Sequence, residues 1–119
     1  MISTKVARAT LIQLTEELDI KGKLSGREQV FKDGEPHDIL GMMLNRLGYQ
    51  GQMSGCCLPP GQTTQVSAYQ EAQRLLNISN IWPIINEIDR AASTNASIRA
   101  CIFRVFGEKN PDPTRVHTR

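Results

Sequence analysis

Apolar residues recur at helical spacing in five separate stretches of this 119-residue chain. The first stretch runs from about Thr4 to Leu18, where apolar side chains three or four positions apart share one face of a helix. The second opens at about Pro36, whose fixed φ suits the first turn of a helix, and closes at Gly48. The remaining three lie near residues 67–77, 81–91 and 94–106. The pattern predicts an all-α fold, a compact bundle of about five helices around one aliphatic core.

Residues that begin and end helices support these boundaries. Ser67 and Gln70 have the spacing of a capping box, and Pro83 is tolerated only in the first turn of a helix. One of residues 93–95 can cap the last helix, and Gly107 can close it in a left-handed conformation. The polar sequence after Gly107 contains two prolines and one aliphatic residue. We therefore predict a single helical domain over residues 1–107 and a disordered tail over 108–119.

The charges of the first helix oppose its dipole. Lys5 and Arg8 lie in the first turns, whereas Glu16 and Glu17 lie near the end. Negative charge is favourable at the start of a helix and positive charge at its end. The stability of this helix is therefore expected to come from packing rather than from its own electrostatics.

Residues 47–70 contain no charged side chain, but they hold four glycines, five glutamines, two adjacent cysteines and two adjacent prolines. This composition predicts a long uncharged loop between the second and third helices. Pro60 and Gly61 suit the central positions of a type II turn. Long loops without regular structure are uncommon in compact domains and are often functional. The loop is therefore interpreted either as an idle connection or as a partner-binding segment.

Composition narrows the class of protein. Charged residues make up 22% of the chain and the net charge is +2, which is too small to indicate a nucleic-acid partner by itself. Lys5 and Arg8 interrupt the apolar core that a signal peptide needs, and no apolar run approaches the roughly 20 residues of a membrane span. The odd cysteine count favours a reducing compartment. These features predict a cytoplasmic protein without a membrane partner.

Catalytic and metal-binding patterns are not evident in the sequence. Adjacent Cys56 and Cys57 fit poorly the ligand spacing of a zinc site, and Cys101 lies on the apolar stripe of the last helix. A thiol enzyme would need His37 as the base for Cys56 or Cys57, an arrangement kept here as a third hypothesis. We predict no catalytic residue, no metal ligand and no cofactor, and therefore not an enzyme.

Residues 70–88 resemble a helix-turn-helix, with Asn77 in the turn as a residue that tolerates a left-handed conformation. Two features depart from that pattern. Pro83 lies where a recognition helix usually has a buried β-branched residue, and Glu87 and Asp89 would repel phosphates. A DNA-binding regulator is the alternative function, and nucleic acid the alternative partner.

Three segments occur in an order similar to that of an uncharacterised family of short helical proteins from bacteria and phages. They are Asp33–Glu35, Ile39–Gly41 and Ile81–Glu87. Trp82 and Asn86 are not adjacent here, so the family's tryptophan–asparagine signature is broken. The resemblance implies a helical fold and a phage or other mobile-element source, and it implies no activity.

The sequence as a whole favours a small non-enzymatic binding protein, an adaptor or inhibitor that acts by protein–protein contact. Tyr49, Met53 and Leu58 are the predicted partner-binding residues of the uncharged stretch. Arg74 and Arg90 are the predicted partner-binding residues of the helical surface, since arginine can form two parallel hydrogen bonds to a carboxylate.

Overall fold

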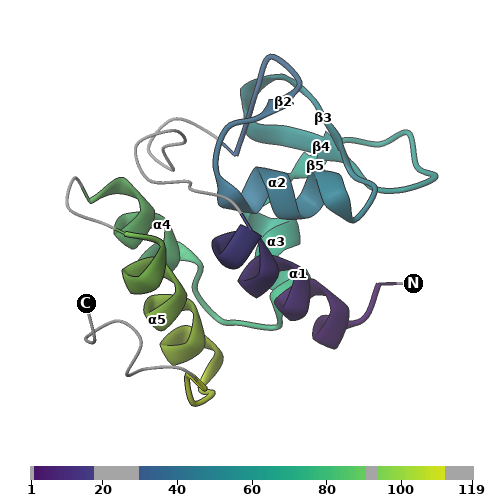
Figure 1. Ribbon diagram of the computed structural model, residues 1–119. Coiled ribbons are helices and arrows are strands. Elements are labelled where there is room, and N and C mark those ends of the chain that lie inside the picture. Colours follow the sequence, from purple (N-terminus) through teal and green to yellow (C-terminus); the bar gives the residue numbers. More distant parts are fainter. Residues whose placement is uncertain (1, 18–29, 91–93, 112–119) are drawn as a thin grey trace.

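The computed structural model describes residues 2–17, 30–90 and 94–111 (Figure 1). Its described part contains five α-helices, which fall within the five predicted stretches. They are α1 (Thr4–Glu17), α2 (Ile39–Arg46), α3 (Ala68–Leu76), α4 (Trp82–Asp89) and α5 (Asn95–Phe106).

Two small antiparallel sheets accompany the helices, so the prediction of an all-α fold is wrong. The strands β1 (Phe31–Lys32) and β2 (Glu35–Pro36) form a hairpin. The second sheet has the order β3-β4-β5, from β3 (Gln50–Gly51), β4 (Cys56–Leu58) and β5 (Val66–Ser67), with a short 3₁₀ helix η1 (Met53–Gly55) between the first two. The fold is a mixed one, and the predicted uncharged loop is a small sheet with its connections.

The strands escaped prediction because they are two or three residues long. The hairpin turns at Asp33 and Gly34, whose φ values of 54° and 83° are both positive. An Asp-Gly pair favours such a turn. A two-residue strand, however, shows no alternation of apolar and polar positions that could reveal it in the sequence.

The second helix begins later than predicted. Pro36 lies in β2, opposite Phe31, and Asp38 is the cap of α2. The Asp38 Oδ1 atom accepts a hydrogen bond of 2.9 Å from the Gly41 backbone N–H. The His37 backbone N–H donates to the Val30 carbonyl at 2.8 Å, which ties the hairpin to the start of the helix.

The predicted ends of the third helix and of the last helix are confirmed. The predicted end of the first helix at Leu18, and residues 112–119 of the predicted tail, lie outside the described residues. Ser67 caps α3 by accepting from the Gln70 backbone N–H, and Asn77 ends that helix in the left-handed conformation with φ 53°. Thr94 caps α5, and Gly107 ends it with φ 72°. Local hydrogen-bonding chemistry therefore sets these boundaries, as the sequence indicated.

The core is shared between the helices and the strands. The central helix is α1, which packs against α2, α3 and α5, while α4 packs mainly against α5. Figure 1 shows the strands gathered beside α2 at one end of the molecule, with α4 and α5 at the other end. Val30, Phe31, Tyr49 and Cys57 from the strand region join the helical core. None of the helices in the described ranges is both long enough and apolar enough to span a bilayer.

Candidate binding site

A pocket of about 540 Å³ opens where the uncharged stretch meets α3. We call it the Tyr49 pocket. Its lining is apolar except for one amide, one cation and the phenol group. The lining residues are Ile2, Tyr49, Pro59, Pro60, Gln62, Arg74 and Leu75.

Two of the lining residues, Tyr49 and Arg74, belong to a hydrogen-bonded group of three side chains. The Tyr49 hydroxyl donates to Glu71 Oε1 at 2.6 Å. Arg74 binds the same carboxylate through two contacts, Nη2 to Oε1 at 2.7 Å and Nε to Oε2 at 3.2 Å. This two-point contact fixes the plane of the guanidinium, which is an advantage of arginine over lysine. The arrangement joins the uncharged stretch to α3.

The ionisation of this group follows from its contacts. The Arg74 hydrogen bond lowers the pKa of Glu71, although partial burial of the carboxylate opposes the change. Burial and the Glu71 carboxylate raise the pKa of Tyr49 to about 12. At neutral pH, Glu71 is therefore an anion and Tyr49 a neutral donor.

Arg74 remains accessible although it is paired. Its side chain is 64% exposed, whereas that of Glu71 is only 13% exposed. Its Nη1 group makes no hydrogen bond to any residue in the described part of the chain. The pocket therefore carries an oriented cation with hydrogen-bonding capacity at its rim.

The structure brings together two of the five predicted partner-binding residues. Tyr49 and Arg74 line the same pocket, and Leu58 lies half-buried in β4 just before Pro59. Met53 is 68% exposed in η1 and does not line the pocket. Arg90, at the end of α4, forms an ion pair with Glu87 at 3.0 Å and also lies outside the pocket lining.

Sequence reasoning missed the role of Glu71. Its separation of three residues from Arg74 is a known spacing for ion pairs on a helix, and this spacing could have indicated the pair. Nothing in the sequence indicated that Tyr49, 22 residues earlier, contacts the same carboxylate.

Cys57 and Cys101 have surroundings unlike those of reactive thiols. Cys57 is 0% exposed in the core, and burial raises the pKa of its thiol to about 11. A thiol protonated at neutral pH is a poor nucleophile. Burial also raises the pKa of Cys101, whose thiol lies 3.4 Å from the Pro83 carbonyl. Within the described ranges, no three His, Cys, Asp or Glu side chains are grouped so that they could hold a metal ion.

The segment that resembles a helix-turn-helix has the expected left-handed turn at Asn77. The Ile81 backbone N–H donates to Gln73 Oε1 at 2.9 Å, which links the start of α4 to α3. The Trp82 side chain is 53% exposed, and its ring lies 5.5 Å from that of Tyr69. DNA binding by this segment stays a prediction.

Comparison of the chain with family models, with curated proteins and with solved structures finds no match. The resemblance to a family of short bacterial and phage proteins therefore also stays a prediction. Function has to be argued from the geometry of the molecule itself.

Proposed function

We propose that this protein is a small non-enzymatic binding protein that acts by contact with another protein, and that the Tyr49 pocket receives a segment of the partner. The observation that carries the proposal is the combination of an apolar pocket with one oriented guanidinium at its rim. Pro60 and Leu75 provide apolar walls, and Arg74 provides the cation.

The pocket is suited to binding without a large ordering cost. Tyr49 is 3% exposed and Leu75 is 4% exposed, so both are held by the core before any partner arrives. The backbone of Pro59 and Pro60 is restricted by the two rings. A site that is already ordered loses less conformational entropy on binding, and arginine and tyrosine are enriched among the residues that dominate interface energies.

The chemistry of the lining suggests what the partner presents. An apolar side chain fits between Pro60 and Leu75 because neither wall has a polar group that would lose hydration unpaired. A carboxylate close to that side chain can accept hydrogen bonds from the Nη1 group of Arg74. We therefore expect a peptide segment with an apolar residue next to an acidic one.

The non-enzymatic part of the proposal is supported by the cysteine environments. The two buried cysteines, Cys57 and Cys101, are free thiols with raised pKa values. Free thiols also support a cytoplasmic location. The proposal of a phage or other mobile-element source rests on the sequence resemblance alone.

Selection of peptides from a random library displayed on phage tests the proposal even while the natural partner is unidentified. The enriched peptides should share an apolar residue beside an aspartate or glutamate. Arg74→Ala should weaken their binding roughly tenfold or more, because it removes a charge-assisted contact. Arg90→Ala should leave binding unchanged, although Arg90 is as exposed as Arg74 and also pairs with a glutamate three residues earlier.

The comparison of these two arginine variants is informative because both remove an exposed cation from the C-terminal end of a helix. Equal loss in both would indicate nonspecific attraction of acidic peptides and would contradict the pocket. Enrichment of peptides that bind Arg74→Ala as tightly as the original protein would contradict it as well. The sequence-based variant Leu58→Asp adds a test of the neighbouring strand, where a folded protein with unchanged binding would place the contact elsewhere.

A DNA-binding regulator remains the alternative, favoured by one observation, the left-handed turn at Asn77 between α3 and α4. Fluorescence anisotropy with a mixed-sequence DNA duplex separates the two functions. Asn80 lies just before α4, at the start of the helix that would enter the major groove. Binding that weakens steeply as salt is raised and is lost in Asn80→Glu would support the alternative.

A further inference from the structure

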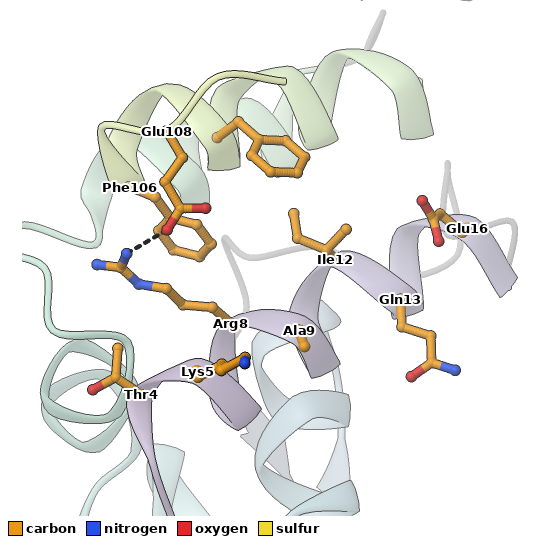
Figure 2. Close-up of a pocket in the computed structure, with 10 residues that line it drawn as sticks. Thr4, Lys5, Arg8, Ala9, Ile12, Gln13, Glu16, Phe106 and Glu108 are labelled. Carbon is orange, nitrogen blue, oxygen red and sulfur yellow. Dashed lines mark hydrogen bonds and ion pairs between the residues drawn. The ribbon is translucent and has the colours of Figure 1, made fainter. Parts of the chain in front are cut away.

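A second open groove, of about 690 Å³, lies between α1 and α5 (Figure 2). It shares no lining residue with the Tyr49 pocket. Lys5, Ala9, Ile12 and Glu16 lie along it on α1, and Phe103 and Phe106 line its other side. Ala9, Lys5 and Glu16 are exposed and Ile12 is half-buried. The groove is therefore an exposed helix face with a small central residue and an aromatic border.

Arg8 forms a fixed border between this groove and the rest of the molecule. Its Nη1 atom lies 2.7 Å from Glu108 Oε2, and its guanidinium carbon lies 4.5 Å from the centre of the Phe106 ring. Its Nε atom also donates to the Leu76 carbonyl at 2.9 Å. Figure 2 shows the dashed contact from Arg8 to Glu108 closing one end of the groove.

The charge of Arg8 is thus satisfied by contacts within the chain, whereas Lys5 and Glu16 have no oppositely charged partner among the described residues. Each also lies at the end of α1 where the helix dipole disfavours its charge, Lys5 near the N-terminus and Glu16 near the C-terminus. No acidic residue in the first turn and no basic residue in the last turn offsets this. This placement weakens the isolated helix, so a contact that neutralises both charges would add to the stability that packing provides.

The four residues of α1 that lie along the groove, Lys5, Ala9, Ile12 and Glu16, form a stripe on the helix surface. This stripe is complementary to itself when two copies of α1 run antiparallel. The spacings from Lys5 to Ala9 and from Ile12 to Glu16 are equal, so the stripe is symmetric about the point between residues 10 and 11. A two-fold axis through that point places Lys5 of one copy beside Glu16 of the other. The same axis places Ala9 of one copy beside Ile12 of the other, a small residue against a large one.

We propose that this α1 face is an interface with a second copy of the same chain, in which two α1 helices pack antiparallel across a two-fold axis. Such an interface is isologous, because the same patch contributes from both sides. Ala9 allows the two backbones to approach, and the Ile12 side chains fill the space above it. The two Lys5–Glu16 pairs fix the antiparallel register, and the aromatic residues of α5 lie at the edge of the contact.

The expected association is weak. Two four-turn helices with the edges of α5 bury less surface than the roughly 1,200–2,000 Å² of a standard stable interface. We therefore expect dissociation constants on the order of 10–100 μM, a range in which the surface ion pairs contribute measurably at low salt.

Sedimentation equilibrium across that concentration range, at low ionic strength, tests the proposal through charge reversal. Lys5→Glu and Glu16→Lys should each weaken association roughly tenfold, since each places two like-charged pairs across the axis. The double variant should recover the original association, because every contact across the axis again joins opposite charges. Ala9→Gln should weaken association by crowding the helices without changing the net charge.

The variants also exclude unfolding as an explanation. Each single reversal places the favoured charge at its end of α1, so circular dichroism should show an equally or more stable helix. Lys32→Glu makes the same charge change on the exposed side of β1 and serves as the matched control, with association unchanged. A monomer at all concentrations, or a double variant as weak as the singles, would overturn the proposal.

Discussion

The starts of α2 and α3 each hold a carboxylate, one at the cap and one in the first turn, yet the pKa values of the two carboxylates shift in opposite directions. Asp38 caps α2, and Glu71 lies in the first turn of α3. At Asp38 the pKa rises from an ordinary value of 3.8 to about 7, and at Glu71 it falls below its ordinary value. The helix termini are similar, so the difference must come from the other neighbours.

The neighbours of Asp38 are a poor match for a charge. The side chain is 0% exposed, and its Oδ2 atom has no hydrogen-bond partner among the described residues. Burial raises the pKa, backbone hydrogen bonds from Gly41 and Leu40 lower it, and the Asp89 carboxylate adds repulsion. Tyr69 is the other titratable group facing it, and its pKa is raised by burial and by the two aspartates. Within the described part of the chain, no cation lowers the pKa of Asp38.

Glu71 has the partners that Asp38 lacks. Arg74 and Tyr49 both donate to its carboxylate, and the side chain remains partly accessible to water. A helix N-terminus alone therefore does not decide whether a carboxylate is charged. The presence of a cation and the degree of burial decide it. The carboxylate with a raised pKa lies in the core, and the paired one lies beside the candidate binding pocket.

The largest expected effect concerns the pH dependence of stability. The folded chain keeps the Asp38 proton up to about pH 7, whereas the unfolded chain releases it near pH 3.8. The stabilisation that protonated Asp38 gives the folded state is therefore complete below about pH 4 and is lost as pH rises to about 7. The difference corresponds to about 4 kcal/mol of unfolding free energy. Urea denaturation between pH 4 and pH 8 measures it.

Asp38→Asn provides the matched comparison, because asparagine is also a good helix cap and is neutral at every pH. The variant should lack the decline and should exceed the original protein in stability at pH 8. If the unfolding free energies of the variant and the original protein changed in parallel between pH 4 and pH 8, Asp38 would be charged in the folded protein. The contrast with Glu71 would then be wrong.

Tyr49→Phe tests the other side of the comparison. The change removes a hydroxyl that donates to a charged acceptor at 2.6 Å and leaves the ring packing intact. We expect a loss of about 1.5 kcal/mol at neutral pH. Thermal and urea denaturation both report it, and an unchanged stability would mean that water replaces the hydroxyl without cost.

Glu71→Gln should have a smaller effect, about 1 kcal/mol, because the amide can still accept from Tyr49 and the partner Arg74 is mostly exposed. The sign of its pH dependence is opposite to that of Asp38. A lowered pKa gives stability that is present above the ordinary value of 4.5 and is lost as pH falls through the folded value. The difference between variant and original should therefore vanish in acid; a constant difference would indicate a packing effect.

Arg74→Lys should change stability least, by less than about 0.5 kcal/mol, since lysine keeps the charge at an exposed position. It should nevertheless weaken the binding of peptides selected on the Tyr49 pocket, because lysine cannot pair with Glu71 through two contacts and keep a further oriented donor for the peptide. Stability measured by urea and affinity measured by fluorescence anisotropy would separate the two roles. Equal affinity would show that only the charge of Arg74 matters.

The sequence predicted the helices better than the strands for a physical reason. Helix ends depend on local chemistry, and residues such as Ser67, Asn77 and Gly107 indicate them within one turn. The short strands depend on partners distant in sequence, as in the pairing of Gly51 with Cys57. No periodic signal survives in two residues.

The candidate site was predictable in part. Arg74 was identified from its side-chain chemistry, and Tyr49 from its place in an unusual uncharged stretch. Their meeting at Glu71 depends on the β3-β4-β5 sheet, which carries residue 49 back onto α3. The burial of Asp38 likewise depends on elements that are far apart in the sequence. Such effects follow from tertiary packing and have no local signature.

Two glycines define how the molecule could be engineered. A Cβ atom at Gly41 would collide with the Val30 carbonyl, and one at Gly51 would collide with the Gly34 carbonyl as well as the Phe31 ring. The hairpin, α2 and the small sheet are therefore held together by backbone contacts that no side chain can enter. Residues 62–65, in contrast, are exposed, and Gln62 reaches the mouth of the Tyr49 pocket. A library diversified at these four positions would vary exposed residues beside the pocket while the two glycines that hold the neighbouring elements together stay unchanged.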